Sequence, residues 1–330
     1  MKKLLGILSL FLLVFVITAL QNPKFIEPYS METLQVKIGL FGILGIGAAL
    51  VIMTGGIDLS IGSIVGLTGT LVTFLLQEKD FSPGSAILLA IALCSFLGLA
   101  HGLLITKLKL QPFVVTLCGL LIYRGAGRWI AGTRSLGFGE HLEGLTKIIS
   151  TEIPFPIPIF GKSYDIPSSF LILLALTAIF SLFLHGTIYG RYLQAIGRNE
   201  QAAQYSGIRT DRMKILAYVL CSTLASIGGV LLAIDANSVQ AASFGNFYEL
   251  YAIAAAVLGG FALTGGEGLI VGVLLGTAVL RLLFKASNFL GISDDLEFAL
   301  VGIVLLIGAV VDEVAKRAVT RLRRRREADS

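Results

Sequence analysis

Apolar segments long enough to cross a bilayer run through almost the whole chain, and this pattern constrains the fold more than any other feature. Hydrophobic residues make up 55% of the sequence and charged residues only 14%, and the mean hydropathy is +0.85. A water-soluble domain of ordinary composition does not reach these values. Segments of about 17–25 apolar residues are typical of transmembrane helices. The sequence therefore predicts an all-α, polytopic membrane helix bundle.

We predict about ten transmembrane helices in a single transmembrane domain that covers residues 1–330. The segments are 4–20, 36–53, 61–76, 86–106, 113–131, 170–184, 215–234, 250–263, 269–284 and 298–311. An even number of helices places both termini on the same side of the membrane. Lys and Arg are more frequent on that side, and cytoplasmic loops carry such an excess. Both termini are therefore predicted to be cytoplasmic.

The net charge of the chain is +5, and its basic residues are densest in the C-terminal tail, residues 312–330, which includes four consecutive arginines, Arg323–Arg326. We expect this cytoplasmic tail to fix the topology and to contact anionic membrane lipid. The sequence shows no basic surface interleaved with aromatic residues, so nucleic-acid binding is not predicted.

The most informative polar sequence lies on a break between the second and third apolar segments. Residues 55–63 read Gly-Gly-Ile-Asp-Leu-Ser-Ile-Gly-Ser. Polar groups at membrane depth need protein or water partners, because bare lipid leaves them unsatisfied. Asp58 could face a transport pathway, or it could cap a helix that begins at Leu59. We expect the segment to lie toward the cytoplasmic ends of its two helices, which favours capping or gating over substrate contact.

Two hydrophilic segments are too long to be simple turns. Residues 132–169 are rich in Pro and Gly, and we expect an irregular or hairpin-like extracytoplasmic loop. Residues 186–214 should form a cytoplasmic loop in which Asn199 caps a short helix that begins at Glu200 and stops at Gly207. Ala202 and Ala203 would give this helix a small-sided surface for docking. An ordinary connector is the alternative.

Charged residues inside the apolar segments require partners. Tyr123 and Arg124 lie in the fifth segment, and a membrane arginine normally faces a cavity or pairs with a carboxylate. Asp235 and Glu249 are the candidate partners of Arg124. Arg281 could pair in the same way with Asp294 or Glu297. A structural ion pair and a gate both remain open for each arginine.

We find no catalytic constellation in the sequence. Its three histidines are scattered over different segments and its three cysteines lie in apolar segments without metal-ligand spacing. The sequence therefore predicts no enzyme, no metal site and no cofactor.

Several blocks together resemble one transporter family. The Gly55–Gly62 block is similar to the signature of permease subunits of bacterial sugar ATP-binding-cassette (ABC) importers of the ribose, xylose and galactose type. Further similar blocks are 111–117 with 123–125, 195–208, and 248–260 with 265–268, and Gly302 and Asp312 also fit the family pattern. His101 stands where the family commonly has Asn, and Glu297 where Gln is usual. These departures leave the substrate open.

The resemblance implies a pore subunit that imports a monosaccharide across the bacterial inner membrane. Its partners would be cytoplasmic ATP-binding subunits, an extracytoplasmic sugar-binding protein, and a second permease copy or a paralogue. The chain has no Walker A sequence of its own. Alternatives are an ion-coupled secondary transporter, or an ABC permease for branched-chain amino acids or nucleosides.

The candidate residues fall into two sets. The resemblance assigns an ATPase-coupling loop to Ala195, Gly197, Asn199, Glu200, Ala202, Ala203, Ser206 and Gly207. The candidates for the pathway or its gate are Gly55, Gly56, Asp58, Ser60, Tyr123, Arg124 and Glu249.

Overall fold

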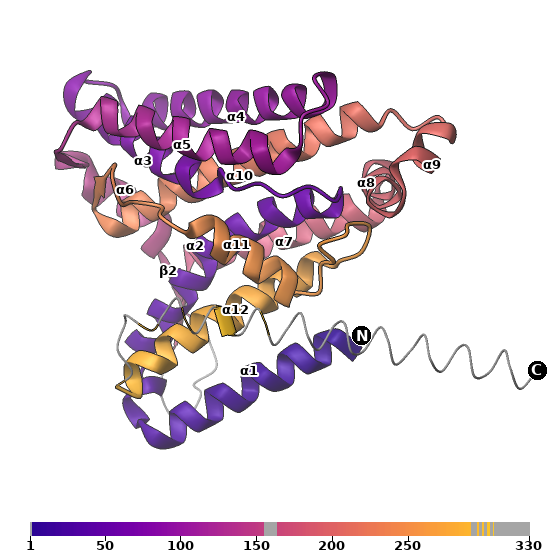
Figure 1. Cartoon of the computed structure of the whole chain (residues 1–330). Helices are drawn as coiled ribbons and strands as arrows, with labels where there is room; N and C mark the ends of the chain where they lie inside the picture. Colours follow the sequence, from indigo (N-terminus) through magenta and orange to yellow (C-terminus); the bar gives the residue numbers. More distant parts are fainter. Residues whose placement is uncertain are drawn as a thin grey trace, which may run out of the picture.

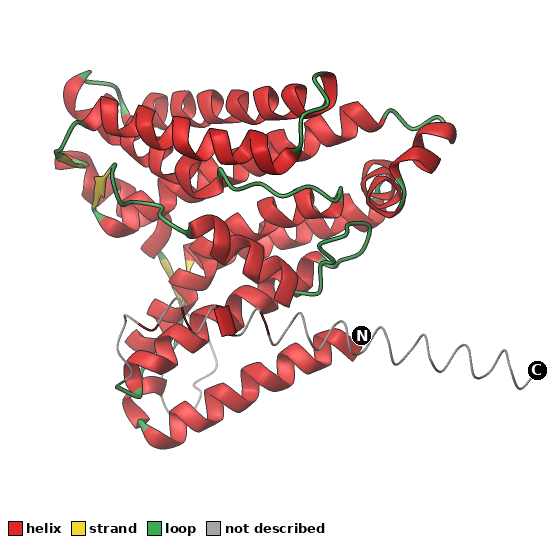
Figure 2. Ribbon diagram, in the orientation of Figure 1, coloured by secondary structure: helices red, strands yellow, loops and turns green. Residues whose placement is uncertain are grey.

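The structure is a computed structural model that describes residues 2–154 and 164–291, together with residues 296, 299, 302, 303 and 306. The described chain is a helical bundle with very little sheet (Figures 1 and 2). Its long helices are α1 (Lys2–Gln21), α2 (Pro28–Met53), α3 (Ile61–Glu78), α4 (Pro83–Lys107), α5 (Pro112–Ala131), α7 (Ser168–Gly186), α10 (Thr210–Ala236) and α12 (Ile270–Phe289).

Shorter elements connect these helices. The short α-helices are α6 (Leu142–Ser150), α8 (Ile188–Arg198), α9 (Glu200–Tyr205) and α11 (Tyr248–Leu258), and the 3₁₀ helices are η1 (Pro23–Ile26) and η2 (Gly139–His141). The strands are β1 (Ser135–Gly137), β2 (Glu152–Pro154), β3 (Asp165–Pro167) and β4 (Ser238–Gln240). In Figure 1, α8 and α9 lie at one end of the bundle and α6 at the other.

Eight helices of the described chain are long and apolar enough to cross a membrane. They coincide with the first seven predicted segments and with the ninth, so the prediction of a polytopic helical membrane protein is confirmed. The eighth predicted segment, 250–263, is instead the eleven-residue α11, about 16 Å long and too short to span a bilayer by itself. The tenth segment and the basic tail lie almost entirely outside the described residues.

The centre of the bundle is α2, of whose apolar window 89% is buried. It packs against α7, α10, α11 and α12. Small residues permit these close approaches. A Cβ added to Gly47 would lie only 3.2 Å from the Cys221 carbonyl oxygen of α10. By contrast, only 28% of the corresponding windows of α4, α5 and α7 is buried, and only 6% of that of α1. These helices therefore form the apolar rim of the bundle.

The α6 end of the bundle carries the predicted long loop. Strands β2 and β3 pair antiparallel, with Ile153 opposite Ile166, which agrees with the expected hairpin. Strand β1 pairs with β4, which directly follows α10. Helix α6 buries Leu145 and Ile149 and packs against α7 and α10. The loop is thus tied to the helices beneath it.

Candidate functional site

The segment between α2 and α3 is a real break in the helical structure. Helix α2 ends at Met53, Gly55 adopts a left-handed conformation with φ of +78°, and α3 begins only at Ile61. The helix therefore starts two residues after the predicted Leu59. Asp58 is 2% exposed. Its Oδ1 accepts hydrogen bonds from the Ser60 amide (2.8 Å) and from the Ser60 hydroxyl (2.6 Å).

Asp58 lies deeper in the bundle than the sequence suggested. Tyr218 and Cys221 of α10 both interact electrostatically with Asp58. Cys221 lies near the middle of α10, whose 27 residues run from Thr210 to Ala236. Seven non-helical residues can extend over about 23 Å. They return the chain to the middle of the bundle, where α3 begins.

Asp58 belongs to a buried polar cluster formed with α4, α5 and α10. The Tyr123 hydroxyl and His101 Nε2 form a 2.8 Å hydrogen bond, and both residues interact electrostatically with Asp58. The His101 and Tyr218 rings pack edge to face with centroids 6.5 Å apart. His101 Nδ1, the Tyr218 hydroxyl and the Ser222 hydroxyl have no hydrogen-bond partner among the described residues. Because buried polar groups normally have partners, this cluster is suited to a hydroxylated solute or water.

Arg124 and Glu249 lie at the first turn of α3, beside this cluster. Arg124 Nη1 donates to the Phe244 carbonyl, and the guanidinium is attracted to the Glu249 carboxylate. Glu249 is 6% exposed and lies directly against the backbone of Gly62. The amino-terminal end of a helix carries partial positive charge, which favours a carboxylate at this position.

The two predicted arginine pairings have different outcomes. Asp235, the other candidate partner of Arg124, instead forms an ion pair with Lys37 at 2.5 Å. Arg281 stacks on the Phe41 ring, 3.5 Å from its centroid, and also on Tyr251 and Phe284. Its candidate partners Asp294 and Glu297 lie outside the described residues.

The short helix predicted after Asn199 is present as α9. Asn199 Oδ1 accepts a hydrogen bond from the Ala202 amide at 2.9 Å, and Gly207 follows the helix with φ of +82°. The predicted surface is wrong for one residue, however. Ala203 is only 5% exposed because it packs toward the bundle, whereas Ala202 is exposed. Tyr205 is 92% exposed and gives α9 an aromatic contact point.

Helix α8 joins α9 to the break after α2. A Cβ on Gly197 would come closer than 3.0 Å to the Met53 carbonyl oxygen and to the Gly266 amide nitrogen, which is too close for any real contact. The Gly266 amide in turn donates to the Met53 carbonyl at 2.9 Å. A Cβ on Gly265 would be 2.7 Å from the Gly55 amide nitrogen. Residues assigned to the coupling loop and to the break therefore meet backbone to backbone.

The remaining coupling-loop candidates hold this arrangement together. Glu200 forms an ion pair with Lys214 of α10 at 2.6 Å. The Ser206 hydroxyl donates to the Ala202 carbonyl at 2.9 Å, and Ala195 is half-buried in α8. Gly56 packs against the Tyr218 side chain, and a Cβ added to Gly56 would lie 2.5 Å from the Tyr218 hydroxyl oxygen.

Sequence reasoning did not assign His101, Tyr218 or Ser222 to the site. Tyr218 and Ser222 are four residues apart and so on one face of a mainly apolar helix, and this spacing is the signal that could have found the α10 pair. His101 was noted only as a departure from the family pattern. Among the described residues, no group of three or more His, Cys, Asp and Glu side chains could hold a metal ion.

A bundle of membrane-spanning helices, with a helix break and buried polar groups at mid-depth, defines the class of membrane transport permeases. The chain belongs to the family described as "Branched-chain amino acid transport system / permease component", whose model matches residues 30–309. The resemblance found from the sequence blocks is thereby confirmed at the level of the family.

The curated relatives match along nearly their whole length. The ribose import permease protein RbsC of Bacillus subtilis strain 168 is 38% identical over 94% of this chain and 93% of its own. RbsC of Escherichia coli K12 is 32% identical over 93% and 92% of the two chains. The L-arabinose transport system permease protein AraH of the same strain is 32% identical over 95% and 91%. No solved structure matches the chain.

Proposed function

We propose that this chain is the permease subunit of an ABC importer that moves a monosaccharide across a bacterial inner membrane. The similarity to permeases named for ribose and L-arabinose, over more than nine-tenths of the chain, supports a sugar substrate. A second copy or a paralogue completes the pore, and a sugar-binding protein supplies it from the extracytoplasmic side. ATP is hydrolysed by separate cytoplasmic subunits, so the chain itself is not an enzyme.

The observation that carries this proposal is the backbone contact of Gly197 with Met53 and Gly266. Helix α9 presents Ala202 and Tyr205 to the outside of the bundle. A partner that moves α9 also moves α8, and α8 has no side chain at Gly197 to absorb the displacement. The motion therefore reaches the ends of α2 and of the 259–268 loop. Coupling of this kind needs an element with two arrangements that both sites bias.

The break carries this motion to the middle of the membrane. Residues 54–60 begin at the junction with Gly197 and end at Asp58 and Ser60 in the polar cluster. A shift of the α2 end thus changes the position of Asp58 relative to Tyr123, Tyr218 and the start of α3. A neutral sugar offers hydroxyl donors and acceptors, which match these groups without a ring of charged side chains.

The ion-coupled secondary transporter is the second candidate, and the buried Asp58 is the observation that favours it. Carboxylates at mid-membrane serve as proton or ion sites in such transporters. The two mechanisms differ in their energy source. Uptake that needs ATP and persists when the proton gradient is collapsed supports the ABC importer, and uptake that follows the proton gradient supports the alternative.

Co-purification of an ATPase with the tagged chain from native membranes tests the proposal directly. We expect Ala202→Arg to abolish the co-purification, because a long charged side chain on the exposed face of α9 blocks a close approach. Ala242→Arg makes the same change at an exposed position just after β4, at the opposite end of the bundle, and should retain the ATPase. Buried Ala203 is a poor choice, because Arg there would disturb packing.

Equal ATPase recovery from both variants would show that α9 is not the docking element. If no ATPase co-purifies with the unmodified chain in any mild detergent, the ion-coupled transporter is favoured instead.

A further inference from the structure

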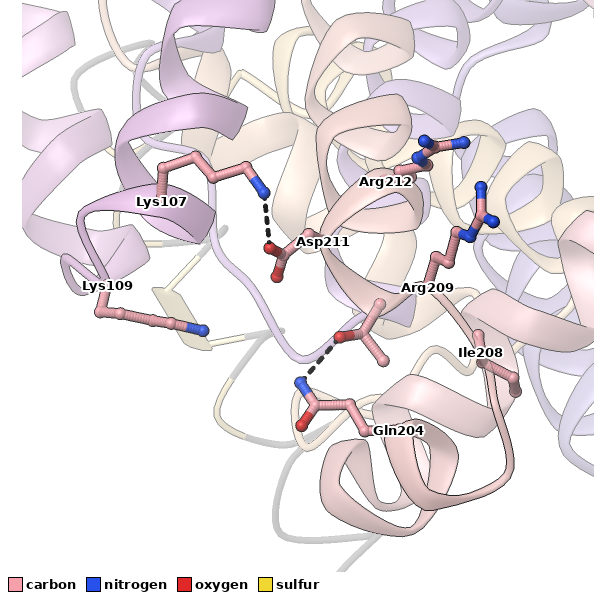
Figure 3. Close-up of a pocket in the computed structure, with 8 residues that line it drawn as sticks. Lys107, Lys109, Gln204, Ile208, Arg209, Asp211 and Arg212 are labelled. Carbon is pink, nitrogen blue, oxygen red and sulfur yellow. Dashed lines mark hydrogen bonds and ion pairs between the residues drawn. The ribbon is translucent and has the colours of Figure 1, made fainter.

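A basic pocket of about 350 Å³ opens at the α8–α9 end of the bundle. It lies between the end of α4 with the turn that follows it and the start of α10, and α9 closes one side (Figure 3). Lys107 and Lys109 lie on the α4 side, and Arg209 and Arg212 lie on the α10 side. Nothing in the proposed import mechanism uses this pocket.

The charge of the pocket is strongly positive. Among the described residues, Asp211 is the one acidic side chain that lines the pocket, and it is already paired with Lys107 at 2.9 Å. Lys109, Arg209 and Arg212 are left with no acidic lining residue of their own. The amino-terminal end of α10 adds partial positive charge at the same place. The pocket is therefore built to receive an anion rather than a neutral sugar.

The residues that follow and alternate with Lys107 and Lys109 along the chain are apolar and exposed. Leu108 is 63% exposed, Leu110 45% and Phe113 52%, and all three belong to the α4–α5 turn or to the first turn of α5. The same two helices bury only 28% of their apolar windows within the chain. Cationic side chains that border an apolar rim at the end of membrane-spanning helices match an amphiphile with an anionic head group.

We propose that this pocket binds the head group of an anionic membrane phospholipid, whose acyl chains lie along Leu108, Leu110 and Phe113. Lys109 and Arg212 supply positive charge from the two sides of the pocket. Gln204 of α9 also lines the pocket and donates to the Thr210 hydroxyl at 2.9 Å. A lipid bound here therefore touches α9 directly, and the composition of the membrane influences the element that we propose to dock the ATPase.

Native mass spectrometry of the purified full chain, loaded with either phosphatidylglycerol or phosphatidylcholine, tests this site without need of any partner. Arg212→Gln should lower the retained phosphatidylglycerol about five-fold, as expected for one basic residue near a membrane surface, worth about 1 kcal/mol. It should leave retained phosphatidylcholine unchanged. Arg191→Gln is the matched control: it makes the same change on exposed α8 outside the pocket, and should have no effect. Arg212→Lys should keep most of the retention.

Three results would overturn the proposal. Equal retention of both lipids by the unmodified chain would show that the pocket has no preference for an anion carried by a lipid. Displacement of the signal by millimolar inorganic phosphate, with no dependence on acyl chains, would assign the pocket to free phosphate. Loss of ATPase co-purification in Arg212→Gln, with unchanged lipid retention, would assign it to an acidic protein surface. Failure of the import proposal itself changes none of these lipid measurements.

Discussion

Replacement of Gly197 by Ala tests the junction between α8, α2 and the 259–268 loop more sharply than any other single change. The new Cβ would lie within 3.0 Å of the Met53 carbonyl oxygen and the Gly266 amide nitrogen, and both are backbone atoms that cannot rotate away. Overpacking of this kind costs about 1–3 kcal/mol. Ala is favoured over Gly in a helix by about 1 kcal/mol, so the observed change is the difference between these two effects.

Gly6→Ala in α1 separates the two effects. Gly6 is helical, and nothing lies within 4 Å of the position of its added Cβ. It therefore gains helix propensity without a clash. The two variants should differ in their free energy of unfolding by the clash alone, about 1–3 kcal/mol, measured by denaturant titration in detergent micelles. In proteoliposomes with the ATPase and the binding protein, the complex that contains Gly197→Ala should still hydrolyse ATP but import less sugar per ATP than the complex that contains Gly6→Ala.

The reasoning is refuted if the two variants unfold together and import the same amount of sugar per ATP. In that case the close approach at Gly197 would be relieved without cost, and the motion of α9 would have to reach the membrane by another route. A loss of stability with normal coupling would be a separate result. It would show that the junction holds the fold together but does not transmit motion.

The remaining predictions concern the polar cluster. Asp58→Asn preserves the shape of the side chain and an oxygen acceptor for Ser60 but removes the charge. Sugar uptake should therefore fall about ten-fold or more, as expected for the loss of a hydrogen bond to a charged group, while expression and ATPase co-purification stay normal. Normal uptake would exclude the carboxylate from the pathway. Tyr123→Phe removes the hydrogen bond to His101 and leaves a buried nitrogen unpaired. The free energy of unfolding should therefore drop by about 1–3 kcal/mol. An unchanged free energy of unfolding in denaturant titration would contradict the observed hydrogen bond.

Much of the fold follows from the lengths of the apolar runs. Eight predicted segments coincide with long helices because a run of this length has no stable alternative in a bilayer. The segment 250–263 departs from this rule because the helix is interrupted at both ends. Phe247 precedes α11 with φ of +65°, and Gly260 follows it with φ of +93°. Hydropathy alone does not register such turns.

The start and end of α9 could also be predicted from the sequence, but the side of α9 that faces the bundle could not. The cap by Asn199 and the stop at Gly207 are encoded in neighbouring residues. Which of Ala202 and Ala203 faces the bundle depends on α8 and α10, and a helix of six residues has too few turns for a hydrophobic face to appear in the sequence. The same limit applies to His101 and Tyr218. They meet Asp58 only because α4 and α10 pack on either side of the break.

The two oxygens of the Asp58 carboxylate have different surroundings in the structure. Oδ1 accepts both hydrogen bonds from Ser60 and so holds the turn that precedes α3, which begins at Ile61, so Asp58 does not cap the helix itself. Oδ2 has no oxygen or nitrogen partner among the described residues, and the Cys221 thiol of α10 lies against the carboxylate. A carboxylate that is half engaged in structure can change its second contact when residues 54–60 move, without loss of the turn. We propose that the break presents an acceptor to the pathway through this second contact.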